Sequence, residues 1–251
     1  MVSVIVRDKR TGDYDMGKGL DPADLVGVSF WIISAAMVAA TFFFWVERDR
    51  AEGKWKTSLT VAAMVTGIAA IHYFYMREVW VNTGASPTVF RYVDWLLTVP
   101  LQIIEFYLIL AAITLVAASV FWRLLIASVV MLVAGYLGEI GAVSTWGGFA
   151  VGMAGWLYII YEVFAGEASQ INASKGTAAS QQAFAALRII VTVGWAIYPL
   201  GYIYGYATAT PDVASLNIIY NLADFVNKIA FGVVIWAAAT GSIWAATSSK
   251  K

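Results

Sequence analysis

Seven long runs of mainly apolar residues divide this chain, and they constrain its fold more than any other feature. An α-helix needs about 20 such residues to cross the hydrocarbon core of a bilayer. The runs lie at about 21–46, 55–76 and 87–110, then from a turn within 111–119 to 137, from a break at 138–141 to 164, and at 178–206 and 213–247. Charged residues make up only 13% of the chain, about half of the ~25% usual in soluble domains. We therefore predict an all-α membrane protein, a bundle of seven transmembrane helices over residues 21–251 that follows a polar tail at 1–20.

Capping signals place two of the helix starts. Asp21-Pro22 and Ser86-Pro87 each join a capping residue to a proline suited to the first helical position. We predict that the first and third helices begin at these pairs. Residues 166–177 form the most polar internal segment, and we predict a mobile loop there.

Two further signals concern helix packing and shape. Pro199 lies inside the sixth run, where its missing N–H frees a backbone carbonyl and permits a kink. Small residues let helix backbones approach closely. Close packing of the fifth helix is therefore predicted from its glycines, which are Gly147, Gly148, Gly152 and Gly155.

The basic residues predict the orientation in the membrane. An odd number of crossings puts the two termini on opposite sides. One side collects Arg48, Arg50, Lys54, Lys56, Arg123, Lys175, Lys250 and Lys251. The other side carries Lys18, Arg77 and the three remaining basic residues of the tail. Because cytoplasmic loops carry an excess of lysine and arginine, we predict an extracellular N-terminus and a cytoplasmic C-terminus.

The composition also excludes several kinds of site. The chain has no cysteine, so disulfides, thiolate metal sites and cysteine nucleophiles are excluded. Its formal net charge is zero and it has no basic run, so nucleic acid is not an expected partner. No metal site is indicated.

Lys228 places an ammonium in the last apolar run, where a charge costs a few kcal/mol. Asp224 lies four residues earlier, about one helical turn away, and can share its face. Two interpretations are open. The pair can be a structural ion pair, or a desolvated, neutral lysine amine can form a Schiff base with an aldehyde.

A stripe of polar residues follows one face of the third run. Within roughly an 80° sector of a helix lie Arg91, Asp94, Thr98, Gln102 and Glu105. Asp94 and Glu105 are about 16 Å apart along the axis, so they are two stations and not a touching pair. The stripe can hold helices together through interhelical hydrogen bonds, or it can form a route for protons or ions. The number of ionisable groups favours the route.

His72 is the only histidine, and its depth in the second run matches that of Asp94. Two interpretations stand side by side. The imidazole can be satisfied by a backbone carbonyl, or it can pair with the carboxylate.

Three motifs together carry a family resemblance. They are RYVDWLLTVPLQIIEF at 91–106, WAIYP at 195–199 and NLADFVNK at 221–228. The chain resembles the microbial (type 1) rhodopsins, and within them the proteorhodopsin family. The resemblance covers all seven runs. It implies a seven-helix retinal-binding domain with all-trans retinal bound to Lys228 as a protonated Schiff base.

The resemblance also implies roles for individual residues. Asp94 and Asp224 would be counterions, with Asp94 the proton acceptor and Glu105 the proton donor. Arg91 would shape the exit side, and His72 would pair with the acceptor. Residues that would contact the chromophore are Trp95, Thr98, Gln102, Trp156, Trp195, Tyr198, Pro199 and Tyr202.

Three positions refine the resemblance. Gln102 stands where green-absorbing relatives have leucine, which implies the blue-absorbing subgroup. Phe149 is bulky where antenna-bearing relatives have a small residue, so no carotenoid antenna is expected. Trp31 matches a residue that reaches a neighbouring protomer, which implies a homo-oligomer, a pentamer or hexamer, surrounded by membrane lipid.

The function implied is a light-driven outward proton pump in the inner (plasma) membrane of a bacterium, and not an enzyme. The alternative is a slow-cycling blue-light photosensor, although Glu105 supplies the donor carboxylate that sensors tend to lack. Asp94 and Thr98 argue against chloride and sodium pumps. We also hypothesise that the direction or the efficiency of pumping fails once acid protonates Asp94.

Overall fold

The structure, a computed structural model, describes residues 6–7, 14–15, 19–208 and 210–241. Within these residues, seven helical segments are long and apolar enough to cross a membrane. The first five begin with α1 (Leu25–Glu47), α2 (Trp55–Thr83), α3 (Thr88–Ile113), α4 (Ala118–Glu139) and α5 (Thr145–Phe164). The last two are formed by α7 (Ala178–Ile189) with α8 (Ile197–Ala207), and by α9 (Val213–Thr240). The predicted seven-helix all-α bundle is confirmed.

The smaller elements lie outside or between these crossings. A 3₁₀ turn at Arg48–Arg50 follows α1, and the short helix α6 (Glu167–Lys175) follows α5. In the N-terminal tail, β1 (Val6–Arg7) pairs antiparallel with β2 (Tyr14–Asp15). The rest of the predicted polar tail lies largely outside the described residues.

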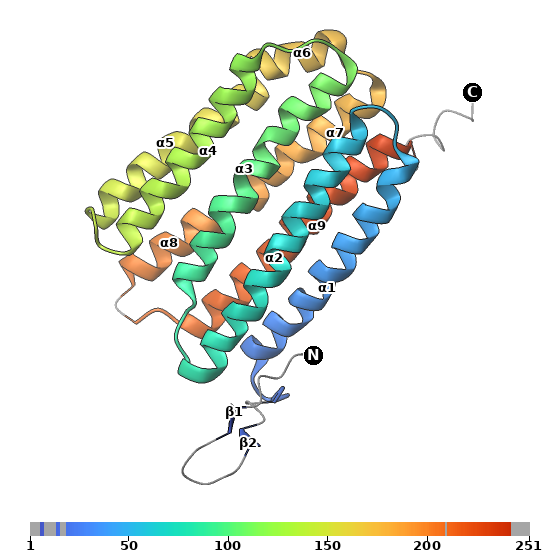
Figure 1. Ribbon diagram of the computed structural model, residues 1–251. Coiled ribbons are helices and arrows are strands. Elements are labelled where there is room, and N and C mark those ends of the chain that lie inside the picture. The colour runs from blue at the N-terminus through green and yellow to red at the C-terminus, as the bar shows by residue number, and fades with distance from the viewer. Residues whose placement is uncertain (1–5, 8–13, 16–18, 209, 242–251) are drawn as a thin grey trace.

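The bundle places α3 at its centre (Figure 1). Helices α1, α2 and α9 lie on one side of it, and α4 and α5 lie on the other. Helix α6 lies at one end, which we term the α6 end, and the start of α9 and the tail strands lie at the opposite end. Helices α3 and α9 run in the same direction (Figure 1), so their polar faces can meet at the same depth.

The outside of the bundle is apolar and its centre is partly polar. Large side chains such as Ile32, Phe42 and Leu222 are exposed, whereas Asp94 and Lys228 are buried. A soluble protein shows the reverse pattern, because charges need water. The arrangement is that of a multi-pass membrane protein with a charged interior.

Helices α4 and α5 pack at backbone distance, as the glycines predicted. A β-carbon on Gly148 would lie 2.5 Å from the Ala134 carbonyl oxygen, and one on Gly155 would lie 3.0 Å from that of Ala127. Gly152 faces the backbone of α4 in the same way. Gly147 differs, since it lies beside the helix cap of α5.

The predicted starts of the first and third helices are wrong by a few residues. Asp24 caps α1 by accepting a hydrogen bond from the Gly27 N–H at 2.9 Å, whereas Asp21 forms a turn ahead of the helix. Pro87, which has no side-chain cap, occupies the N-cap position of α3 in place of Ser86. The cap of α1 lies three residues after the predicted Asp21, and the cap of α3 lies one residue after the predicted Ser86.

Two helix ends also differ from the prediction. Helix α2 continues to Thr83 because the first strong breaker is Gly84, which adopts a left-handed conformation with φ 66°. Helix α9 ends at Thr240, ahead of the predicted 247, where Gly241 adopts the same conformation. The turn predicted within 111–119 is confirmed between Ile113 and Ala118.

The loop predicted at 166–177 is wrong, because the segment forms helix α6. Glu167 in its first turn lies 2.7 Å from Arg123 of α4, and Ala168 donates its N–H to the buried Glu162 of α5 at 3.1 Å. Ala168 and Asn172 are buried against the bundle. The segment is polar, but it contains the good helix formers alanine, glutamate, glutamine and lysine. These tertiary contacts hold the helix against the bundle.

The sixth crossing is broken in the middle by a π turn at Ile190–Gly194. The Trp195 N–H bonds to the Ile190 carbonyl at 3.0 Å, five residues back. Pro199 cannot donate to Trp195, whose carbonyl instead accepts from Tyr198 at 3.1 Å. The predicted irregularity at Pro199 is therefore present, and it extends a full turn further than expected.

Candidate functional site

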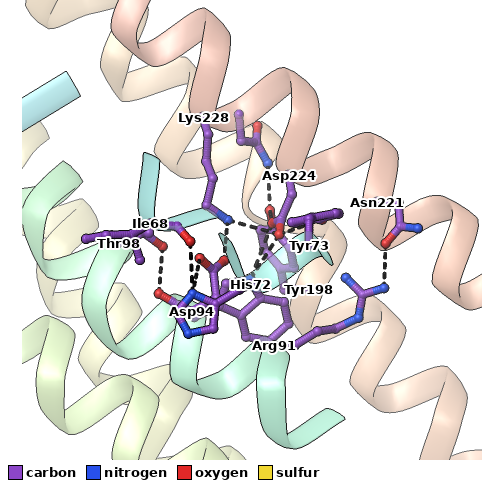
Figure 2. Close-up of polar contacts among 12 residues, drawn as sticks. Ile68, His72, Tyr73, Arg91, Asp94, Thr98, Tyr198, Asn221, Asp224 and Lys228 are labelled. Carbon is purple, nitrogen blue, oxygen red and sulfur yellow. Dashed lines mark hydrogen bonds and ion pairs between the residues drawn. The ribbon is translucent and has the colours of Figure 1, made fainter. Parts of the chain in front are cut away.

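Lys228 meets two carboxylates at the centre of the bundle (Figure 2). Its Nζ atom lies 2.9 Å from Asp94 Oδ2 on α3 and 2.9 Å from Asp224 Oδ2 on its own helix α9. The lysine is 2% exposed and both aspartates are 0% exposed. Removing one partner from such a group strands a buried charge, at a cost of about 3–5 kcal/mol.

The oxygens of Asp224 are surrounded by donors. The Tyr198 hydroxyl donates to Oδ1 at 2.6 Å and the Tyr73 hydroxyl to Oδ2 at 2.8 Å. The Trp95 indole N–H lies 3.3 Å from Oδ1. With Lys228 as a fourth donor, this carboxylate has little free capacity to accept a proton.

Asp94 is held differently. Its Oδ1 atom is buried without a hydrogen-bond partner. The nearest ring nitrogen, His72 Nδ1, lies 3.8 Å away, beyond hydrogen-bond distance, and instead approaches the Ile68 carbonyl oxygen at 2.9 Å. His72 therefore lies near both of its expected partners, the backbone carbonyl and the Asp94 carboxylate, and the backbone carbonyl is the closer of the two. Thr98 donates to the Asp94 carbonyl at 2.9 Å and fixes the backbone there.

Arg91 lies one helical turn from Asp94, toward the end opposite α6. Its Nη2 atom donates to Asn217 at 2.9 Å and to Asn221 at 2.5 Å, both on α9. The Nε and Nη1 atoms are buried without hydrogen-bond partners. A buried guanidinium with spare donors can stabilise an anion or ordered water on that side of Asp94.

Glu105 lies on the same helix toward the α6 end and is 1% exposed. Both of its carboxylate oxygens lack a hydrogen-bond partner, and Ser58 of α2 is its polar neighbour. Beside it, Phe106 packs against Phe184 of α7 with ring centroids 4.9 Å apart. The Glu105 carboxylate is therefore buried, next to an aromatic contact that joins α3 to α7.

A cavity of about 250 Å³ adjoins Lys228. Its lining includes seven of the eight expected chromophore contacts, which are Trp95, Gln102, Trp156, Trp195, Tyr198, Pro199 and Tyr202. The eighth, Thr98, is not among these lining residues, and its hydroxyl donates to the Asp94 backbone carbonyl. Phe149 also lines the cavity and stacks on Tyr202 with ring centroids 5.3 Å apart.

These walls suit an apolar, unsaturated ligand with a group that reacts with an amine. Aromatic side chains supply flat apolar surfaces, and Lys228 is the amine at the cavity wall. The two carboxylates at its Nζ atom suit a cation held at that position. Gly152 and Gly201 add lining without a side chain.

Three polar neighbours of the site were not predicted from the sequence. Tyr73 gives no signal, because a tyrosine in a transmembrane helix is unremarkable. Asn217 and Asn221 could have been found, since they share the spacing of Asp224 and Lys228 and form one stripe on α9. A neutral amide in an apolar run is a weaker signal of a functional site than a charged side chain.

Trp31 lies away from this site, toward the side of the bundle formed by α1 and α2. It packs edge-on against Phe74 with ring centroids 5.8 Å apart, and the Arg77 guanidinium lies 5.8 Å from its ring. The position leaves Trp31 partly exposed.

Comparison with known proteins agrees with this architecture. The family described as "Bacteriorhodopsin-like protein" matches residues 24–242. Blue-light absorbing proteorhodopsin of Gamma-proteobacterium Hot 75m4 is 58% identical over 222 residues, which cover 88% of each chain. Green-light absorbing proteorhodopsin of Gamma-proteobacterium EBAC31A08 is 57% identical over 221 residues, again 88% of each.

A solved structure is similar to the same extent. The crystal structure of blue light-absorbing proteorhodopsin from Med12 superimposes with a TM-score of 0.75 at 57% identity, covering 87% of this chain and 99% of that one. The similarity therefore extends from the family motifs to nearly the whole bundle. The chain belongs to the bacteriorhodopsin-like family and, within it, to the proteorhodopsins.

Proposed function

We propose that this chain is a light-driven outward proton pump that carries all-trans retinal on Lys228. The observation that carries the proposal is the arrangement of three buried carboxylates about one buried amine. Two of them touch the Lys228 nitrogen, and the third, Glu105, lies farther along α3 with its oxygens unpaired. Intramembrane carboxylates in series mark proton relays.

Retinal, bound to Lys228 as a Schiff base, would supply a light-driven isomerisation that displaces the proton on the linkage nitrogen. Trp95, Trp156, Trp195, Tyr198 and Tyr202 would hold the polyene through the cavity walls. Asp94 and Asp224 would keep the nitrogen cationic in the dark.

Asp94 is the proton acceptor in this proposal. It and Asp224 are equally close to the nitrogen, but Asp94 alone has a carboxylate oxygen free of other donors. A proton leaving Lys228 Nζ would therefore be held on Asp94. Arg91 lies one turn further toward the end opposite α6, where the proton would leave the protein. Its guanidinium would stabilise negative charge on that side of Asp94.

Glu105 would return a proton to Lys228 Nζ from the opposite direction. Because it lies toward the α6 end, net transport would run from that end to the other. The basic connections and the C-terminal helix end lie at the α6 end, so we assign this end to the cytoplasm. Transport is then outward.

The cellular setting follows from the same proposal. The exposed apolar helix faces would contact lipid in the inner membrane of a bacterium. The partly exposed Trp31 supports contact with a second copy in a homo-oligomer, a pentamer or hexamer. The chain would act as a transporter and not as an enzyme.

Illumination of a weakly buffered suspension of cells that express the chain with retinal tests the proposal. We expect external acidification in the light that a protonophore abolishes. A coloured protein that gives no pH change would contradict the pump and support the slow-cycling photosensor.

Glu105→Gln should keep the dark colour and slow its recovery after a flash by about 100-fold, the usual scale for losing a positioned proton donor. The amide has the shape of the acid but no proton to give, so the return becomes dependent on bulk proton concentration. Flash spectroscopy at several pH values measures this. Glu52→Gln, an exposed carboxylate at the same end, is the control; equal recovery in the two variants would refute the donor role.

Gln102→Leu should move the absorption maximum to longer wavelength. Gln102 lines the cavity and points its Nε2 atom toward the Asn227 carbonyl oxygen at 3.4 Å. A polar amide beside the chromophore favours the dark charge distribution over the excited one, and leucine removes that preference at similar volume. Absorption spectra of the purified variants decide the matter, and an unchanged maximum would exclude Gln102 as the blue-tuning residue.

A further inference from the structure

The cavity beside Lys228 reaches the surface at the end of the bundle opposite α6. Among the described residues that line the cavity, only Tyr206 and Val213 are exposed, at 41% and 38%. Tyr206 lies in the last turn of α8, and Val213 is the first residue of α9. Both of these helix ends lie opposite α6 (Figure 1). The cavity therefore has a mouth between the end of α8 and the start of α9.

One face of α9 forms a continuous wall from this mouth to the amine. Residues three or four positions apart lie on the same face of a helix. At such intervals the cavity is lined by Val213, Leu216, Tyr220, Asp224 and Lys228. The first and the last of these are about 22 Å apart along the helix axis. The cavity is thus a passage that leads from the surface to Lys228.

Two glycines of α8 line the same passage, and they differ in their surroundings. A β-carbon on Gly201 would collide with the Tyr220 hydroxyl, so close packing requires glycine there. At Gly205, one turn nearer the mouth, the nearest atom to such a β-carbon would be Leu216 Cδ2, 4.0 Å away. Glycine destabilises a helix interior relative to alanine, and no close contact requires it at Gly205. The missing side chain leaves open space at the mouth.

Contacts between helices close the sides of the cavity that face lipid. The Tyr202 hydroxyl of α8 donates to the Thr145 carbonyl of α5 at 3.2 Å, and its ring stacks on Phe149. Nearer the α6 end, the Trp156 indole N–H of α5 donates to the Val191 carbonyl at 2.9 Å. Helices α4 and α5 pack at backbone distance. A ligand that enters from the hydrocarbon layer would have to break these contacts, whereas entry through the mouth breaks none of them.

The mouth lies at the level where the membrane meets water. Tyr204 and Tyr206, both in the last turn of α8, are each 41% exposed, and tyrosines are enriched at this level of a membrane protein. The hydroxyl-bearing residues Ser86 and Thr88 also line the cavity near this end. Retinal is an apolar chain with one polar aldehyde group. It dissolves in a bilayer and can place its aldehyde at the same level as the mouth.

We propose that retinal enters the chain through this mouth, between α8 and α9, and that Gly205 keeps the passage open. The inference rests on the proposed function, because it takes retinal to be the ligand of Lys228. Gly205 acts in the assembly of the pigment, and its effect is on the rate at which retinal reaches the amine.

Gly205→Phe tests the route by placing a ring in the mouth. All-trans retinal is added to the full chain in membranes of cells grown without retinal, and the rise of the visible band is followed to its final amplitude. We expect the rate constant of this rise to fall about tenfold, because retinal must displace extra bulk from a packed space.

Ala207→Phe is the matched control. It adds the same ring to the same helix, but about 200° round the axis, at an exposed position that is not among the lining residues. This control should form pigment at the parent rate. Equal rates in the parent and both variants would overturn the route.

A reversible block separates a closed mouth from a misfolded chain. Gly205→Cys introduces a single thiol, because the chain has no cysteine. Modification with benzyl methanethiosulfonate should slow pigment formation, and removal of the benzylthio group with dithiothreitol should restore the rate in the same molecules. Ala207→Cys, treated in the same way, should not respond. A rate that is unchanged by complete modification of Gly205→Cys would show that retinal does not pass this point.

The two proposals fail in distinguishable ways. If retinal gives no visible band in the parent, the ligand assignment fails and the proposed function fails with it. If the band forms at the same rate with the mouth open and blocked, the proposed function stands and only the entry route is lost. If Gly205→Phe does not fold, the reversible block of Gly205→Cys decides by the same readout.

Discussion

Asp94→Asn should give a coloured protein that transports no protons in the light. The amide has nearly the shape of the carboxylate, so the cavity and the contact with Lys228 are preserved, but it cannot take up the proton that leaves Nζ. Losing a positioned proton-transfer group typically lowers a rate by about 10²–10⁴-fold. External pH traces, normalised to the amount of pigment, should therefore show less than about a hundredth of the parent signal.

The same variant should absorb at longer wavelength, because it removes a negative charge 2.9 Å from the cationic nitrogen. Acid should do this to the parent, since protonation also neutralises Asp94. The parent maximum should thus move to longer wavelength as the pH falls, and the variant maximum should stay in place. His72 lies 3.8 Å from Asp94, in addition to Lys228 and Asp224, so His72→Asn should change the midpoint of this shift and not its direction.

Asp49→Asn is the control for this experiment, because its carboxylate is exposed and lies on the turn after α1. Pumping by Asp94→Asn at the parent rate would show that the acceptor is another group. Asp224 would then be the next candidate, in spite of the donors that surround it. A parent maximum that does not respond to acid would contradict the idea that protonated Asp94 stops transport.

The charged part of the site could be predicted because the membrane penalises isolated charges. Lys228 and the stripe from Arg91 to Glu105 stand out in runs that are otherwise apolar, and helix geometry alone places each set on one face. The contact between Asp94 and Lys228, 134 residues apart, needed the fold. So did the difference between the two aspartates, which depends on tyrosines and a tryptophan from three helices.

The parts that were missed depend on tertiary contacts. Helix α6 was predicted to be a loop because it is polar, but its contacts with Arg123 and Glu162 hold it against the bundle as a helix. The π turn could not be predicted from the sequence. Pro199 accounts for the missing helical donor of the Gly194 carbonyl but not for that of the Val191 carbonyl. The stability of the π turn depends on donors from Trp156 and Asn227, which lie on other helices.

Lys228→Ala should abolish the visible absorption band, because Lys228 is the only lysine among the described residues that line the cavity. Retinal added to the variant should give only the spectrum of the free aldehyde. Lys175→Ala, an exposed lysine on α6, should keep the full band. Borohydride reduction of the coloured parent, followed by digestion and mass spectrometry, should place the retinyl group on the peptide that contains Lys228.

The same substitution should destabilise the protein even without retinal. It leaves Asp94 and Asp224 buried without their shared cation, at a cost of about 3–5 kcal/mol for a stranded buried charge. Lys228→Ala combined with Asp94→Asn should recover part of that loss, because the amide removes one of the two stranded charges. Thermal unfolding of the retinal-free variants in one detergent measures the difference. If the double variant is less stable than Lys228→Ala, the two carboxylates do not depend on Lys228 for their burial, and the ion-pair network at the centre of the site must be reconsidered.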